Sequence, residues 1–185
     1  MFSEDPKGRS TSPLPGWVRA VNALSRAFGI FAAALLVVSI GVICQMVFVR
    51  AVLGQSAIWQ TEFSIFAVVA ATFLGAPYVL LTRGHVAVDV LPLMVAHKAR
   101  RRLFIAGYLA LLAFCALFLW ASLPWWYETW VNNQTTASLW RARLWIPYLS
   151  VPVGLALLCL QAASELVLVL TRRALPFNLR PDEGL

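Results

Sequence analysis

Charged residues are scarce in this 185-residue sequence. Aspartate, glutamate, lysine and arginine make up only 12% of it, whereas 61% is hydrophobic. Its mean hydropathy is +0.76, and soluble domains usually carry about twice this fraction of charge. The scarcity of charge excludes an ordinary soluble protein. It predicts an all-α integral membrane protein with several spans and short connections.

Cysteine and histidine are too few and too widely spaced to suggest a metal or redox centre. Cys44, Cys115 and Cys159 lie in separate apolar runs, and no Cys-x-x-Cys pair is present. His85 and His97 both fall in a polar connection, whereas a membrane haem protein needs histidine ligands within its spans. The sequence also has no phosphate-binding loop and no recognisable pairing of a nucleophile with a base. We therefore expect neither a cofactor nor an enzymatic activity.

Four apolar runs have the length that crosses a bilayer as a helix. They cover approximately residues 27–49, 63–81, 103–126 and 145–170. We expect a single four-helix membrane domain over residues 17–175, with a disordered tail at residues 1–16 and a second tail at residues 176–185. Residues 17–28 and 84–102 have apolar side chains at helical spacing, which predicts two short amphipathic helices at the membrane surface. An N-terminal extension of the first span is the alternative for residues 17–28.

Lysine and arginine are unevenly distributed between the two sides of this predicted domain. Twelve of the fifteen lie on the side that carries both termini, and only Arg50, Arg141 and Arg143 lie on the other side. Because cytoplasmic loops collect basic residues, both termini are predicted to be cytoplasmic. The same distribution explains the isoelectric point near 10.0 without a nucleic-acid partner. Six tryptophans gather at the predicted outer boundary, as in an aromatic belt: Trp59, Trp125, Trp126, Trp130, Trp140 and Trp145.

Small and polar residues within the spans indicate how the helices pack. Two sets of small residues at helical spacing would permit close helix approach. Glu165 is the clearest ionisable residue inside a span, and Gln161 lies one turn before it. Either Glu165 pairs with a charge in a partner subunit, or it bonds locally or reaches the membrane interface. The two predicted packing seams are Gly29, Ala33 and Gly41 in the first span, and Ala67, Ala71 and Gly75 in the second.

The most informative stretch joins the second span to the segment after it, TEFSIFAVVAATFLGAPYVLLTRGHVAVDVLP. It resembles the small four-span subunit, of the DctQ type, of TRAP (tripartite ATP-independent periplasmic) transporters. In that family a glutamate precedes the second span, and a Gly-His-hydrophobic-x-x-Asp-like segment follows it. The matching residues are Glu62, Phe66, Phe73, Gly75, Ala76, Gly84, His85, Val86 and Asp89.

The resemblance implies a non-catalytic scaffold subunit in the bacterial inner membrane. It implies a stable heterodimer with a large, elevator-type permease subunit that binds the substrate and sodium ions. A periplasmic binding protein would make transient contact and deliver an organic acid, and membrane lipids would surround the subunit. The alternatives are the small subunit of a tripartite tricarboxylate transporter, and a small membrane electron-transfer or enzyme subunit.

The polar residues after the second span have two interpretations. Arg83, His85 and Asp89 lie within about two helical turns of one another, with Gly84 between the first two. They would either lock the turn through charge-assisted hydrogen bonds or dock onto the large subunit or lipid headgroups.

Overall fold

The computed structural model describes residues 15–54, 58–82 and 97–171, and these ranges are almost entirely helical. The helices are α1 (Gly16–Leu53), α2 (Trp59–Leu81), α4 (His97–Val131), the short α5 (Trp145–Tyr148) and α6 (Ser150–Leu170). Within the described ranges, four helical segments are long and apolar enough to cross a membrane: Gly16–Leu53, Trp59–Leu81, Arg102–Val131 and Trp145–Leu170. The predicted all-α membrane fold is therefore confirmed.

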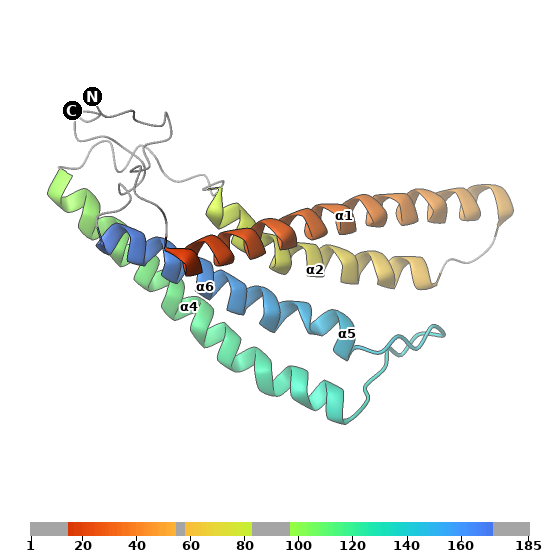
Figure 1. Ribbon diagram of the computed structural model, residues 1–185. Coiled ribbons are helices and arrows are strands. Elements are labelled where there is room, and N and C mark those ends of the chain that lie inside the picture. Colours follow the sequence, from red (N-terminus) through yellow and green to blue (C-terminus); the bar gives the residue numbers. More distant parts are fainter. Residues whose placement is uncertain (1–14, 55–57, 83–96, 172–185) are drawn as a thin grey trace.

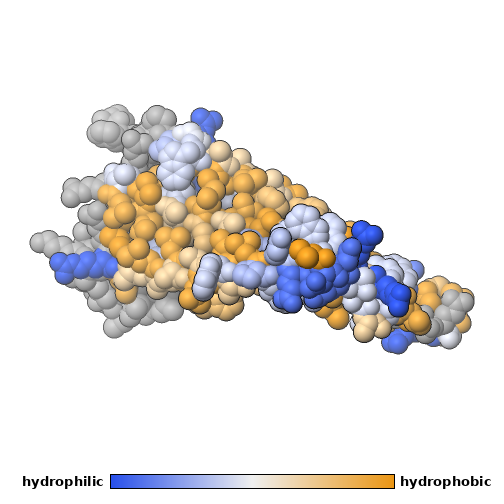
Figure 2. All heavy atoms as spheres, turned by 90° about the horizontal axis from the view of Figure 1, so that it is seen from below, coloured by the Kyte–Doolittle hydropathy of each residue, from blue (hydrophilic) through white to orange (hydrophobic). Residues whose placement is uncertain are grey.

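The helices converge at one end of the molecule and separate at the other (Figure 1). α1 and α2 form an antiparallel pair, and α6 packs against both α2 and α4. We call the end where α1 begins and α6 ends the closed end. The opposite end, where α1 ends and α2 and α5 begin, is the open end. Hydrophobic residues cover most of the helical surface seen in Figure 2, and hydrophilic residues appear at its left edge and in a cluster on its right-hand half. This distribution is typical of a protein whose helix surfaces face lipid.

The separate surface helix predicted for residues 17–28 is absent. α1 continues unbroken from Gly16 to Leu53, so the alternative, an N-terminal extension of the first span, describes the segment better. Trp17 and Leu24 are exposed on this part of α1, whereas Val18 and Ser25 are fully buried. No proline interrupts the helix, and its inner face packs on the bundle instead of on the membrane surface. At about 1.5 Å per residue, α1 is ~57 Å long and extends well beyond a hydrocarbon core of ~30 Å.

The second predicted surface helix, at residues 84–102, falls mostly outside the described residues. Its last residues, from His97 onward, already belong to α4, which is 35 residues long. The third predicted span, residues 103–126, is therefore the central part of a longer helix, α4. The basic residues Lys98, Arg100, Arg101 and Arg102 lie in the first turns of this helix.

Close contacts at two glycines hold α2 against its two neighbours. A Cβ atom built on Gly154 of α6 would lie 2.6 Å from the carbonyl carbon of Phe73 in α2. The Phe73 carbonyl has no helical donor four residues ahead, because that position is Pro77. On the other side of α2, a Cβ atom built on Gly29 of α1 would lie 2.6 Å from the Cβ atom of Tyr78. Only glycine fits at these two positions without displacing a neighbouring helix.

Candidate functional site

A buried polar cluster joins α1 to α6 in the half of the bundle nearest the closed end. Gln161 is completely buried, and its side-chain oxygen accepts a hydrogen bond of 2.8 Å from the Ser25 hydroxyl. Its Nε2 atom donates to Asn22 Oδ1 at 3.1 Å. The Ser164 hydroxyl donates to the Gln161 backbone carbonyl at 2.8 Å. Because these groups satisfy one another, the cluster fixes the position of α1 on α6.

Glu165 lies one turn after Gln161 and is only 5% exposed. It is not free, because it interacts with another residue of the chain. The two polar residues singled out in the sequence thus both face the interior of this chain. Burial favours the local interpretation of Glu165 over a charge presented to a partner subunit. The sequence did not reveal Ser25 and Asn22 as partners of Gln161. They lie 136 and 139 residues away from it along the chain, and nothing in the residues around them marks them out.

The first turn of α2 presents hydrogen-bond acceptors that have no donor. Gln60 is 5% exposed, and its Oε1 atom is buried without a hydrogen-bond partner. The Oε2 atom of Glu62, two residues later, is also buried and unpartnered. Buried acceptors are nearly always satisfied in native proteins. Among the described residues, this turn at the open end therefore holds two buried acceptors without a donor, one of them on the motif residue Glu62.

The remaining motif residues are distributed differently. Gly75 faces α1, where an added Cβ atom would lie 3.3 Å from the Cβ atom of Ala32. Arg83, Gly84, His85 and Asp89 lie outside the described residues. The two interpretations of that segment, intrachain locking and docking, therefore stay predictions.

The two small-residue seams have different environments. Ala67 and Ala71 of α2 are about 95% buried in the core of the chain. On α1, Gly29 is buried against Tyr78, whereas Ala33 and Gly41 are exposed on the surface of this chain. A Cβ atom added to Gly41 would meet nothing within 4 Å. Of the α1 seam, only Gly29 therefore packs against another helix of this chain. The second close helix contact is made by Gly154 of α6, a residue that the sequence did not single out.

The six tryptophans expected at one membrane boundary do gather at the open end. Trp59 lies 6.4 Å from Trp140, measured between ring centroids. Trp130 lies 6.3 Å from Trp145 and 5.1 Å from Trp126. The Trp126 indole N–H donates to the Trp145 backbone carbonyl at 3.1 Å, which ties α4 to α5. Trp125 completes the set by stacking on Tyr148. Amphipathic indoles at one level are typical of a membrane–water interface.

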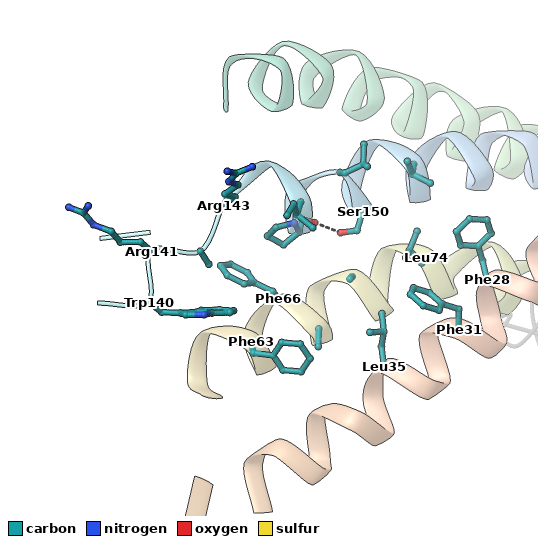
Figure 3. A pocket seen from close by; sticks show the side chains of 17 residues that line it. Phe28, Phe31, Leu35, Phe63, Phe66, Leu74, Trp140, Arg141, Arg143 and Ser150 are labelled. Atoms are coloured by element: carbon teal, nitrogen blue, oxygen red, sulfur yellow. Dashed lines mark hydrogen bonds between the residues drawn. The ribbon is translucent and has the colours of Figure 1, made fainter. Parts of the chain in front are cut away.

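An apolar groove of about 620 Å³ lies between the α1–α2 pair and the segment that enters α6. Figure 3 shows Phe28, Phe31, Leu35, Phe63, Phe66 and Leu74 along one side, with Trp140 and the start of α5 and α6 on the other. Arg141 and Arg143 line its end nearest the 132–144 loop. The sequence did not indicate this groove, because its walls come from four helices, α1, α2, α5 and α6, and from a loop.

These features define a class of protein, a small multi-pass membrane protein with a hydrogen-bonded polar cluster inside its bundle. The described residues include no group of three or more histidine, cysteine, aspartate or glutamate side chains able to hold a metal ion. The chain belongs to the DctQ family, described as the DctQ component of tripartite ATP-independent periplasmic transporters, whose family model matches residues 39–172. It is therefore a transporter component and not an enzyme.

A curated relative supports this identification. The chain is 30% identical over 132 residues to the "C4-dicarboxylate TRAP transporter small permease protein DctQ" of Pseudomonas aeruginosa PAO1. The matched region covers 70% of this chain and 63% of the relative, so the chain spans less than two thirds of that protein. No solved structure matches the chain. The resemblance to the TRAP small subunit noted in the sequence is confirmed.

Proposed function

We propose that this chain is the non-catalytic scaffold subunit of a sodium-coupled, binding-protein-dependent TRAP transporter that imports an organic acid. Family membership is the observation that carries the proposal, because the DctQ component is one part of a tripartite system. The relative's name specifies a C4-dicarboxylate, which makes a small organic acid the first substrate class to test. The substrate and the sodium ions would bind to a large membrane subunit of the elevator type.

The arrangement of the polar groups supports a scaffold role. A transporter core exposes ionisable side chains or unwound helices to a central site. Here Gln161, Ser25 and Asn22 are hydrogen-bonded to one another inside the bundle. Such a cluster makes the subunit rigid, which suits a fixed support for a moving partner.

The distribution of charge supports an orientation. Arg19 and Arg26 lie near the closed end of α1, and Arg102 lies near the start of α4. We place this end in the bacterial cytoplasm together with both termini, and the open end in the periplasm, because basic residues accumulate on the cytoplasmic side. The open end would then be the side that a binding protein approaches.

The unpartnered acceptors of α2 supply the test. We expect Glu62→Ala to weaken retention of the large subunit, since the Glu62 side chain is only partly covered by this chain and its Oε2 atom has no donor among the described residues. The tagged chain would be captured from its native membranes in mild detergent, and the co-purifying large subunit would be quantified by mass spectrometry. Glu128→Ala, at an exposed glutamate of α4, is the matched control. Equal retention by the two variants would refute the contact at Glu62. A natural chain that purifies without any large multi-span subunit would refute the assembly itself.

A further inference from the structure

The groove near the open end has an interior that suits a hydrocarbon chain. Phenylalanine and aliphatic side chains form most of its lining. Ser150 is the one hydroxyl residue in the lining, and its Oγ atom already donates to the Pro147 carbonyl at 2.6 Å. No side chain in the apolar interior therefore offers a specific contact to a polar ligand, whereas an apolar chain could fill the groove through van der Waals packing.

The depth of the groove corresponds to one leaflet of a bilayer. Its lining on α2 extends from Phe63 to Leu74, eleven residues along the helix. At about 1.5 Å per residue this distance is ~16 Å, roughly half of a hydrocarbon core of ~30 Å. The groove begins at the level of Trp140, which belongs to the aromatic cluster of the open end. A lipid tail that enters at this level would end near the middle of the membrane.

The mouth of the groove carries positive charge on a loop whose backbone is hydrogen-bonded. Arg141 and Arg143 are lining residues, and the lining contains no acidic residue. They belong to a hydrogen-bonded loop in which Thr136 N–H donates to the Ala142 carbonyl at 3.0 Å and Leu144 N–H donates to the Gln134 carbonyl at 3.0 Å. Arg143 also forms an isolated β-bridge with Thr135.

The loop keeps the two guanidinium groups outside the apolar interior. Arg141 has a positive φ of 47°, which non-glycine residues rarely adopt. Figure 3 shows its side chain directed away from the apolar walls, and Arg143 standing at the start of α5. Of the three arginines at the open end, two thus stand beside the groove, and the third, Arg50, lies in the last turn of α1. This arrangement matches a ligand with an anionic head and an apolar tail.

We propose that the groove binds a membrane phospholipid, with one acyl chain between α2 and the α5–α6 segment and its phosphate at Arg141 and Arg143. The bound lipid would fill the space between separated helices and brace the open end of the bundle. The proposal does not depend on the transport role, because the groove and both arginines belong to this chain alone.

The first experiment identifies the occupant in the native membrane. A photoreactive benzoylphenylalanine would replace Phe66, which lines the groove, and the crosslinked product of the full-length chain would be analysed by mass spectrometry. We expect the phospholipid adduct at Phe66 to be enriched in anionic lipid relative to the adduct at Ala33, an exposed residue of α1 that reports the bulk bilayer. Identical lipid profiles at the two positions would overturn the proposal. A polypeptide adduct at Phe66 would overturn the proposal in favour of a helix of a partner subunit.

The second experiment separates the headgroup contact from the tail contact. Phosphatidylglycerol would be titrated onto the purified chain, and retained lipid would be counted by native mass spectrometry. We expect the double variant Arg141→Gln/Arg143→Gln to bind this lipid on the order of tenfold more weakly, whereas Arg50→Gln should bind it normally. Ala70→Trp, which fills the groove, should lose the lipid with both arginines intact.

The results that would overturn the lipid site differ from those that would overturn assembly with the large subunit. Equal binding by the arginine double variant and by Arg50→Gln would overturn the headgroup assignment. Effective competition by inorganic phosphate alone would indicate a simple anion site and overturn the tail assignment. Retention of the large subunit is measured separately, so a failure of the lipid site would not be confused with a failure of the complex.

Discussion

The contact between Gly154 and the Phe73 carbonyl gives the sharpest stability prediction. In Gly154→Ala the added methyl group would lie 2.6 Å from the Phe73 carbonyl carbon and 2.8 Å from its Cβ atom. Real Cβ atoms do not approach other atoms so closely, so α6 and α2 would have to move apart. A backbone group cannot turn away as the end of a side chain can. The strain therefore has no local relief.

The magnitude follows from two opposing effects. Overpacking a closely packed contact costs about 1–3 kcal/mol of unfolding free energy. Replacing glycine by alanine within a helix contributes about 0.5–1 kcal/mol in the opposite direction, through backbone entropy. The two central values differ by roughly 1 kcal/mol, so we expect Gly154→Ala to lower the unfolding free energy by about 1 kcal/mol. Gly41→Ala, at a helical glycine with nothing within 4 Å, should leave it unchanged or raise it slightly.

The assay is reversible unfolding of the purified chain in mixed micelles by increasing sodium dodecyl sulfate, followed through its tryptophan fluorescence. Gly29→Ala gives an intermediate case, because its new methyl group meets the Tyr78 side chain and not a backbone carbonyl. The expected order of stability is Gly41→Ala, then Gly29→Ala, then Gly154→Ala. If Gly154→Ala unfolds at the same denaturant concentration as Gly41→Ala, the close contact between α2 and α6 does not exist as described.

Two further predictions concern the closed end and the orientation. Gln161→Leu should lower the unfolding free energy by about 1–2 kcal/mol in the same assay, because it leaves the buried Ser25 hydroxyl and Asn22 without their partner. An unchanged midpoint would mean that the cluster does not join α1 to α6. In a variant without the natural cysteines, Leu139→Cys, at a residue that is 86% exposed, should react with an impermeant thiol reagent in intact cells. Gly16→Cys should react only after the cells are permeabilised, and the reverse pattern would invert the proposed orientation.

The sequence predicted the helices better than their ends. Apolar length identifies the part of a helix that lies in lipid, but α1 begins eleven residues before the first apolar run, at Gly16 instead of Ala27. Those extra residues are amphipathic, and hydropathy does not distinguish packing on a bundle from packing on a membrane surface. The continuous helix is decided by the tertiary contacts of Val18 and Ser25, which are fully buried.

The candidate sites depended still more on tertiary structure. Gln161 and Glu165 stood out in the sequence because polar residues are rare in spans, and both are buried in the bundle. Their rarity did not indicate which residues they contact. The close approach at Gly154 also escaped prediction, since it depends on Pro77 freeing a carbonyl on another helix. The groove beside Phe66 arises only where the helices separate at the open end.

The central claim is that this chain supports transport without carrying the substrate, and reconstitution tests it directly. The large subunit, the binding protein and this chain would be combined in liposomes with a sodium gradient, and uptake of a radiolabelled C4-dicarboxylate would be measured. Other organic acids would follow in the same assay. We expect uptake by the complete system, none with this chain alone, and little or none when this chain is omitted. Uptake by this chain alone, or full uptake in its absence, would contradict the scaffold role.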